Sequence, residues 1–86
     1  MVGKKEVKTM EVKVLFFGVL AEITGTNFKS YREAKSLGDL KLMIEDDFPE
    51  IVHYNYRISL NSEFINNNPA LDDGDEIAFM PPFAGG

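Results

Sequence analysis

The sequence contains no cysteine. This absence excludes disulfide bridges, cysteine-ligated zinc and a thiol nucleophile, so any sulfur that the protein handles must come from another molecule. Histidine occurs once, at position 53. Because no serine or cysteine partner for His53 is evident nearby, we interpret it as a solvated loop residue rather than a catalytic base.

Long apolar runs and excess positive charge are also missing. No run approaches the roughly 20 residues that a membrane-spanning helix needs, and no charged-then-apolar segment with a cleavage site opens the chain. Nine Lys and Arg stand against 14 Asp and Glu, for a net charge of −5. Binding of nucleic acid relies on clustered positive charge, so a basic protein surface is the more natural partner. We therefore predict a soluble cytoplasmic protein that binds neither nucleic acid nor membranes.

What is present suffices for one folded domain. The 86 residues are 44% apolar and include seven Phe and three Tyr, enough for one modest core but not for two. We expect a flexible extension at residues 1–9, the domain at residues 10–80 and an extended tail at residues 81–86.

Apolar periodicity and turn residues predict the order of the elements. Alternation within residues 10–17 puts Val12 and Val14 on one face, with both faces expected to be buried toward the end of this strand. The predicted elements are a strand at 10–17, a helical turn at 19–24, a strand at 27–31, a helix at 37–48, an irregular stretch around 53, and strands at 56–60, 63–65 and 76–80.

The predicted helix carries start and stop signals. Ser36 is its N-cap, with Asp39 at a capping-box-like spacing, and Pro49 ends it. Apolar residues recur every three or four positions and predict a face that packs on the core: Leu37, Leu40, Ile44 and Phe48.

The element order predicts an α+β fold in which a mixed sheet of four to five strands packs on one main helix. The first and last strands are the most apolar and should lie at the centre of the sheet. With a helix joining the second strand to the third, this arrangement is a ubiquitin-like β-grasp, although composition alone leaves a ferredoxin-like fold open.

The end of the chain is its most informative segment. Pro81 and Pro82 follow the last strand, and neither can donate a main-chain hydrogen bond. Residues 81–86 reach about 20 Å when extended, and Gly85 and Gly86 are narrow enough to enter another protein's active site. The Gly86 carboxylate is a poor electrophile, but adenylation with ATP would let a sulfur donor convert it into a thiocarboxylate. The alternative is an ordinary chain end that finishes in two glycines.

Two segments strengthen the first interpretation. The run at residues 13–18 (KVLFFG), continued by LAE at 20–22 and TG at 24–25, and the run at residues 71–86 (LDDGDEIAFMPPFAGG), resemble the small, sulfur-carrying subunit of molybdopterin synthase. The similarity covers about residues 11–86, and its C-terminal block is the specific part.

The resemblance implies a β-grasp fold and a thiocarboxylate on Gly86, formed after an activating enzyme related to ubiquitin E1 has adenylated it with ATP. A sulfur donor protein would supply the sulfur, and the tail would insert into the large catalytic subunit to pass sulfur to a pterin precursor. The chain itself would be a carrier, not a catalyst, with no bound cofactor or metal. The residues expected to contact the partner are Phe17, Met80, Pro81, Pro82, Phe83, Ala84 and Gly85.

Other interpretations stay open. Phe17, Met80 and Phe83 could form an exposed docking patch or could be buried. The acidic run at residues 72–76 lacks the ligand spacing of a calcium loop and is interpreted as a turn around Gly74. A carrier for thiamine synthesis or tRNA thiolation, a protein modifier joined through Gly86 to lysines, and a binding module with an inert tail are the competing functions.

Overall fold

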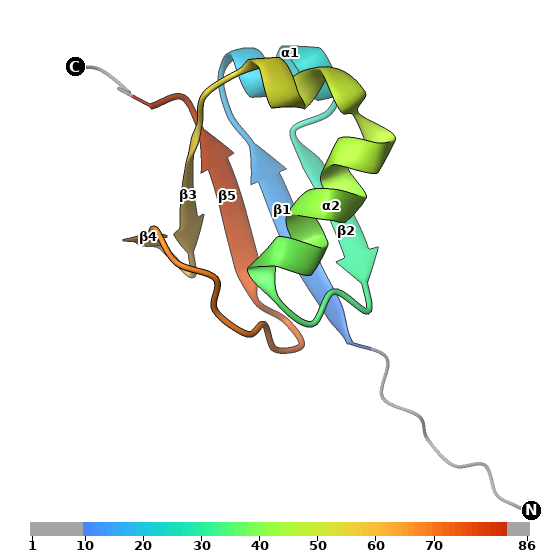
Figure 1. Ribbon diagram of the computed structural model, residues 1–86, viewed down its shortest axis with the longest axis vertical. Coiled ribbons are helices and arrows are strands. Elements are labelled where there is room, and N and C mark those ends of the chain that lie inside the picture. Colours follow the sequence, from blue (N-terminus) through green and yellow to red (C-terminus); the bar gives the residue numbers. More distant parts are fainter. Residues whose placement is uncertain (1–9, 83–86) are drawn as a thin grey trace, which may run out of the picture.

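The computed structural model describes residues 10–82, so the predictions for residues 1–9 and 83–86 lie outside the described part. Figure 1 shows the fold. Its elements in chain order are β1 (Glu11–Phe16), α1 (Val19–Thr24), β2 (Phe28–Arg32), α2 (Leu37–Asp47), η1 (Pro49–His53), β3 (Arg57–Leu60), β4 (Glu63–Ile65) and β5 (Glu76–Met80).

The five strands form one mixed sheet in the order β2-β1-β5-β3-β4. β1 and β5 lie next to each other and run parallel, while the other neighbours are antiparallel. Helix α2 connects β2 to β3 and crosses one face of the sheet (Figure 1). These findings confirm the predicted β-grasp fold and the inner position of the first and last strands. No helix within residues 10–82 is long and apolar enough to cross a membrane.

The core lies between the sheet and α2. Alternate residues of β1 and β5 point toward the helix, and Val14, Ile77 and Phe79 have no exposed surface. Leu40 and Ile44 of α2 pack against them with 0% and 1% exposure. Burial of large apolar side chains is the main stabilising contribution in a domain of this size, so this layer holds the two faces together.

Helix α2 begins as predicted. The Ser36 Oγ accepts a hydrogen bond from the Asp39 N–H at 3.2 Å. The Asp39 carboxylate accepts from the Lys35 N–H, also at 3.2 Å, so it reaches one residue beyond the position that a reciprocal capping box would use. The helix ends at Asp47, and Phe48 is only partly buried, with its ring 6.0 Å from that of Phe16.

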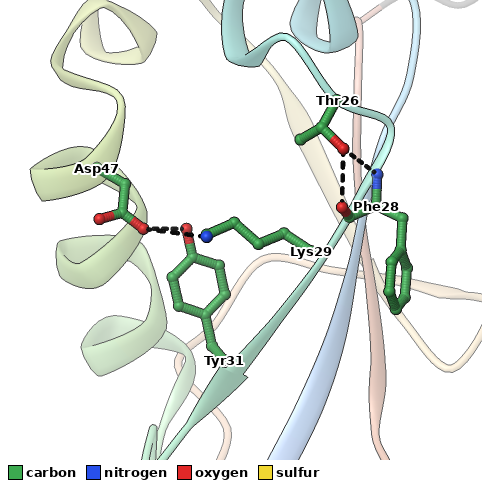
Figure 2. Close-up of polar contacts among 5 residues, drawn as sticks. All are labelled: Thr26, Phe28, Lys29, Tyr31 and Asp47. Atoms are coloured by element: carbon green, nitrogen blue, oxygen red, sulfur yellow. Dashed lines mark hydrogen bonds and ion pairs between the residues drawn. The ribbon is translucent and has the colours of Figure 1, made fainter.

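The far end of α2 is tied to edge strand β2 through Asp47 (Figure 2). The Tyr31 hydroxyl donates to the Asp47 Oδ2 at 2.8 Å, and the Lys29 Nζ lies 3.9 Å from the same oxygen. Burial of the phenol, together with the neighbouring carboxylate, raises the pKa of Tyr31. Asp47 thus holds the helix against a strand that has only one sheet neighbour.

Two sequence expectations are corrected. The stretch around His53 is not irregular but forms the 3-10 helix η1. The end of β1 is not buried on both faces: Phe17 is 46% exposed, since no helix covers that second face.

Candidate functional site

The site begins where β5 leaves the sheet. The Phe17 N–H donates to the Phe79 carbonyl oxygen at 3.0 Å, and Met80 pairs with Arg57 as the last residue of the strand. Pro81 is half-buried and Pro82 exposed. Because neither proline has an N–H to extend the ladder, the chain departs here, at the end of the sheet that α1 occupies (Figure 1).

The predicted site residues divide into two groups. The structure places Phe17, Met80, Pro81 and Pro82 close to this exit. The other four predicted residues lie outside the described part of the chain: Phe83, Ala84, Gly85 and Gly86.

Phe17 and Met80 share the sheet face that α2 leaves uncovered. Both line a hollow of about 240 Å³, together with Phe64. Phe17 is 46% exposed and Met80 is half-buried. Of the two possibilities left open by the sequence, the structure therefore supports an accessible patch at Phe17.

Sequence reasoning missed most of this patch. Leu15, Phe17, Ala78, Met80 and Phe64 surround the first hollow, and a second hollow of about 500 Å³ extends from Leu15 and Phe17 to Phe28. Phe28 and Phe64 are 47% and 53% exposed. We call this surface the open-face patch; its residues are Leu15, Phe17, Phe28, Phe64, Ala78 and Met80.

Arg57 brings a positive charge to the edge of the open-face patch. Its guanidinium carbon lies 3.9 Å from the centroid of the Phe64 ring. This stacking holds the guanidinium against the surface, where it can bind a carboxylate. The period-two alternation of β1 could have located Leu15, but Phe28 and Phe64 come from opposite edges of the sheet, and only the strand order brings them to one face.

The acidic run is a turn, as predicted. Gly74 has φ 87°, and the carboxylates of Asp73 and Asp75 accept hydrogen bonds from the Glu11 N–H and the Asp72 N–H. The second Asp75 oxygen accepts from the Asn61 amide at 2.9 Å. Within residues 10–82 no group of three acidic or His side chains could hold a metal ion. These carboxylates anchor the loop before β5.

An accessible apolar surface that adjoins the exit of a chain end suits binding of another protein. Exposed aromatic side chains bury large areas when a partner covers them. Phe17, Phe28 and Phe64 supply such anchors.

Comparison with known proteins agrees with this arrangement. A molybdopterin synthase sulfur carrier subunit from Chlamydomonas reinhardtii is 32% identical over 83 residues, covering 90% of this chain and 100% of the relative. The solved complex of subunits 1 and 2 of the molybdopterin-converting factor from Helicobacter pylori contains a chain that is 30% identical, with a TM-score of 0.68, over 90% of this chain and 100% of that chain.

A third similar protein is small archaeal modifier protein 1 from Methanosarcina acetivorans. Its solution structure has a TM-score of 0.76 and 26% identity, over 93% of this chain and 100% of that one. The ThiS family model matches residues 14–86, which include the whole segment at residues 71–86 and all but Lys13 of the segment at residues 13–18. With this match, the relatives and the β-grasp sheet all in agreement, the chain belongs to the ThiS family.

Proposed function

We propose that this chain is the sulfur-carrier subunit of a molybdopterin synthase, working in the cytoplasm. The observation that carries the proposal is the reach of the family match: it runs through β5 to residue 86, past the last element of the fold. The 32% identical relative, a molybdopterin synthase sulfur carrier subunit, is matched over its full length. The tail is thus shared as well as the domain.

The reacting group is the carboxylate of Gly86. It attacks the α-phosphorus of ATP on an E1-like activating enzyme, and pyrophosphate leaves. A sulfide-level sulfur, delivered by a donor protein, then attacks the carbonyl carbon; the bond to AMP breaks, AMP leaves with the electron pair, and the sulfur proton passes to solvent. The sulfur of the resulting thiocarboxylate attacks a carbon of a pterin precursor on the large subunit and displaces an oxygen leaving group. Water then cleaves the bond between the sulfur and the Gly86 carbonyl carbon, which leaves the sulfur on the pterin and restores the Gly86 carboxylate, so this chain is a carrier and not a catalyst.

The open-face patch supplies the docking energy in this scheme. The Helicobacter relative was solved as a complex of the two subunits of the converting factor. We assign the corresponding contact here to Phe17, Phe28 and Phe64 of the open-face patch, in which Phe17 lies next to the end of β5. Binding through a rigid sheet leaves the tail free to enter the active site of the large subunit.

Deletion of Gly86 tests the proposal. The loaded chain, mixed with the large subunit and a pterin precursor, is expected to yield molybdopterin, and the deletion variant to yield none. The Tm of the deletion variant should stay within about 2 °C of the wild-type value, because the buried core is formed by residues between Val12 and Phe79. Product formation by the deletion variant would contradict the assigned role of Gly86.

A second candidate function is protein modification. The 26% identity and TM-score of 0.76 to small archaeal modifier protein 1 favour it as an alternative. The same carboxyl would then form an isopeptide bond with a lysine of a target. Incubation with the activating enzyme, ATP and cell extract would produce high-mass conjugates that contain this chain, whereas the carrier function predicts release of the free chain after sulfur transfer.

A further inference from the structure

The tail leaves the domain beside a glycine that makes room for it. β1 and β5 run parallel and end side by side, joined by the Phe17 N–H to Phe79 carbonyl bond of 3.0 Å. One residue later the chain of β1 turns at Gly18 into α1, while the chain of β5 continues to Pro81. The first residue of the tail therefore meets the β1–α1 turn.

Gly18 has a backbone conformation that side chains oppose. Its φ is 59° and its ψ −136°, a combination reserved almost entirely for glycine. Positive φ alone does not require glycine in this chain, since Glu33, Asn61 and Ser62 have φ values of 63°, 50° and 77°. A second reason for glycine at position 18 lies in what touches it.

A side chain at position 18 would collide with the tail. A Cβ atom built on Gly18 would lie 2.9 Å from the Cγ and 3.5 Å from the Cδ of Pro81, closer to the Cγ than carbon atoms pack. Gly25 and Gly74 also have positive φ, yet a Cβ on either would meet nothing within 4 Å. Among the glycines of residues 10–82, only Gly18 leaves space for Pro81 by lacking a side chain.

Pro81 needs such a support. The residue has no N–H, so the hydrogen-bond ladder of the sheet cannot hold it, and its ring is rigid. The Pro81 ring lies where a Cβ atom of residue 18 would be, and Pro81 is half-buried, while the next residue, Pro82, is exposed. We call this placement of the Pro81 ring against Gly18 the Gly18 seat. Because the ring is rigid, the Gly18 seat determines the direction in which the backbone leaves β5.

We propose that Gly18 is a positioning residue for sulfur transfer: by seating Pro81 it aims the tail, and hence the loaded carboxyl of Gly86, at the active site of the large subunit. This role rests on the proposed carrier function. Gly18 acts through Pro81, not through contact with the reacting atoms. The open-face patch provides affinity, and the seat provides direction.

The test compares Gly18→Ala with Gly25→Ala, each loaded as the thiocarboxylate. Both variants place a methyl group at positive φ and should lower the Tm, and Gly18→Ala should lower it more, because Gly18 has ψ −136° and Gly25 has ψ 9° in the left-handed region. Only the methyl group at position 18 meets Pro81. Gly18→Ala should lower kcat for sulfur transfer by about tenfold to a hundredfold and change the Kd for the large subunit by less than about threefold, because misdirection of a reacting group slows the reaction within a complex that still forms. Gly25→Ala should keep the wild-type kcat.

A double variant identifies the contact itself. Pro81→Ala removes the Cγ and Cδ atoms that a Cβ at position 18 would meet. In that background Gly18→Ala should change kcat by less than about twofold, since coupling between the two sites disappears with the atoms that carry it. Equal kcat losses for Gly18→Ala with and without Pro81→Ala, or equal losses for Gly18→Ala and Gly25→Ala, would overturn the proposal.

Two further readouts keep the proposal separate from the carrier function. If Gly18→Ala does not fold, Pro81→Ala alone should lower kcat at nearly unchanged Kd, and an unchanged kcat would count against the seat. In the unloaded wild-type chain, NMR should show a nuclear Overhauser effect between the Gly18 Hα protons and the Pro81 ring. Its absence would refute the seat, whereas a chain that shows it but never acquires a thiocarboxylate would refute only the carrier function.

Discussion

At the scale of single residues, Tyr31 is the polar side chain most closely integrated with the core. Tyr31 as a whole is 6% exposed, and its hydroxyl donates to the Asp47 Oδ2 at 2.8 Å. Burial first, and then the hydrogen bond and charge of Asp47, raise its pKa above the usual value near 10. The folded state therefore favours the neutral phenol over the ionised form.

Tyr31→Phe should lower the free energy of unfolding by about 1 kcal/mol at pH 7, because one hydrogen bond to a carboxylate is lost. The pH dependence has a definite sign. A raised pKa in the folded state contributes stability that is complete below about pH 10 and declines as the pH rises toward the folded pKa, because the unfolded phenol ionises first. The difference in the free energy of unfolding between wild type and Tyr31→Phe should thus become smaller above pH 10, as measured by denaturant titrations.

Two other tyrosines serve as references for this titration. Tyr56 also has a pKa raised by burial and by Glu45. The Tyr31→Phe variant should therefore still lose some free energy of unfolding as the pH rises above 10. Tyr54→Phe is the control, because Tyr54 is 41% exposed and its substitution should leave the free energy of unfolding unchanged. A gap for Tyr31→Phe that widens above pH 10 would show that the hydroxyl is not held as described.

At the scale of elements, α2 covers one face of the sheet and completes the hydrophobic core. Two of its leucines provide a matched pair. Leu40 is fully buried against the sheet, whereas Leu42, two positions further along the same helix, is 68% exposed. The difference between the effects of their substitution by alanine measures what packing on the sheet contributes to the free energy of unfolding.

Leu40→Ala should reduce the free energy of unfolding by about 3 kcal/mol, through lost burial and the cavity left behind. Leu42→Ala should change it by less than about 0.5 kcal/mol, as is usual for a solvent-exposed position. Urea unfolding at a single pH would measure both. Similar losses for the two variants would contradict the placement of α2.

Local signals made most of these elements predictable. Ser36 and Asp39 mark the start of α2, its apolar residues recur at helical spacing, and Pro49 marks its end. Alternation in β1 showed correctly which residues share a face. It could not show whether a second layer covers the other face, and the prediction that both faces are buried near Phe17 was wrong for that reason.

At the scale of the whole molecule, one face of the sheet builds the core and the other builds the open-face patch. Phe28 of β2 and Phe64 of β4 come from the two edges of the sheet. Their place on one surface depends on strand pairing between segments far apart in the sequence, which no local pattern encodes. The exit of the tail was predictable because two prolines act locally.

Phe64→Ala should weaken binding of the large subunit by about tenfold or more, or about 1.4 kcal/mol, because exposed aromatic anchors dominate such interfaces. Its Tm should change little, since Phe64 is 53% exposed. Val52→Ala is the control: Val52 is 55% exposed but lies in η1, outside the open-face patch. Isothermal titration calorimetry would measure both, and equal affinities for Phe64→Ala and wild type would remove this residue from the interface.

The carrier function itself is tested most directly by intact mass spectrometry of this chain after incubation with an E1-like activating enzyme, ATP and a sulfur donor. We predict a mass increase equal to the difference between one sulfur and one oxygen atom, located by fragmentation at Gly86 and absent when ATP is omitted. An unchanged mass with a competent activating enzyme and donor, or a mass increase at any other residue, would contradict the account.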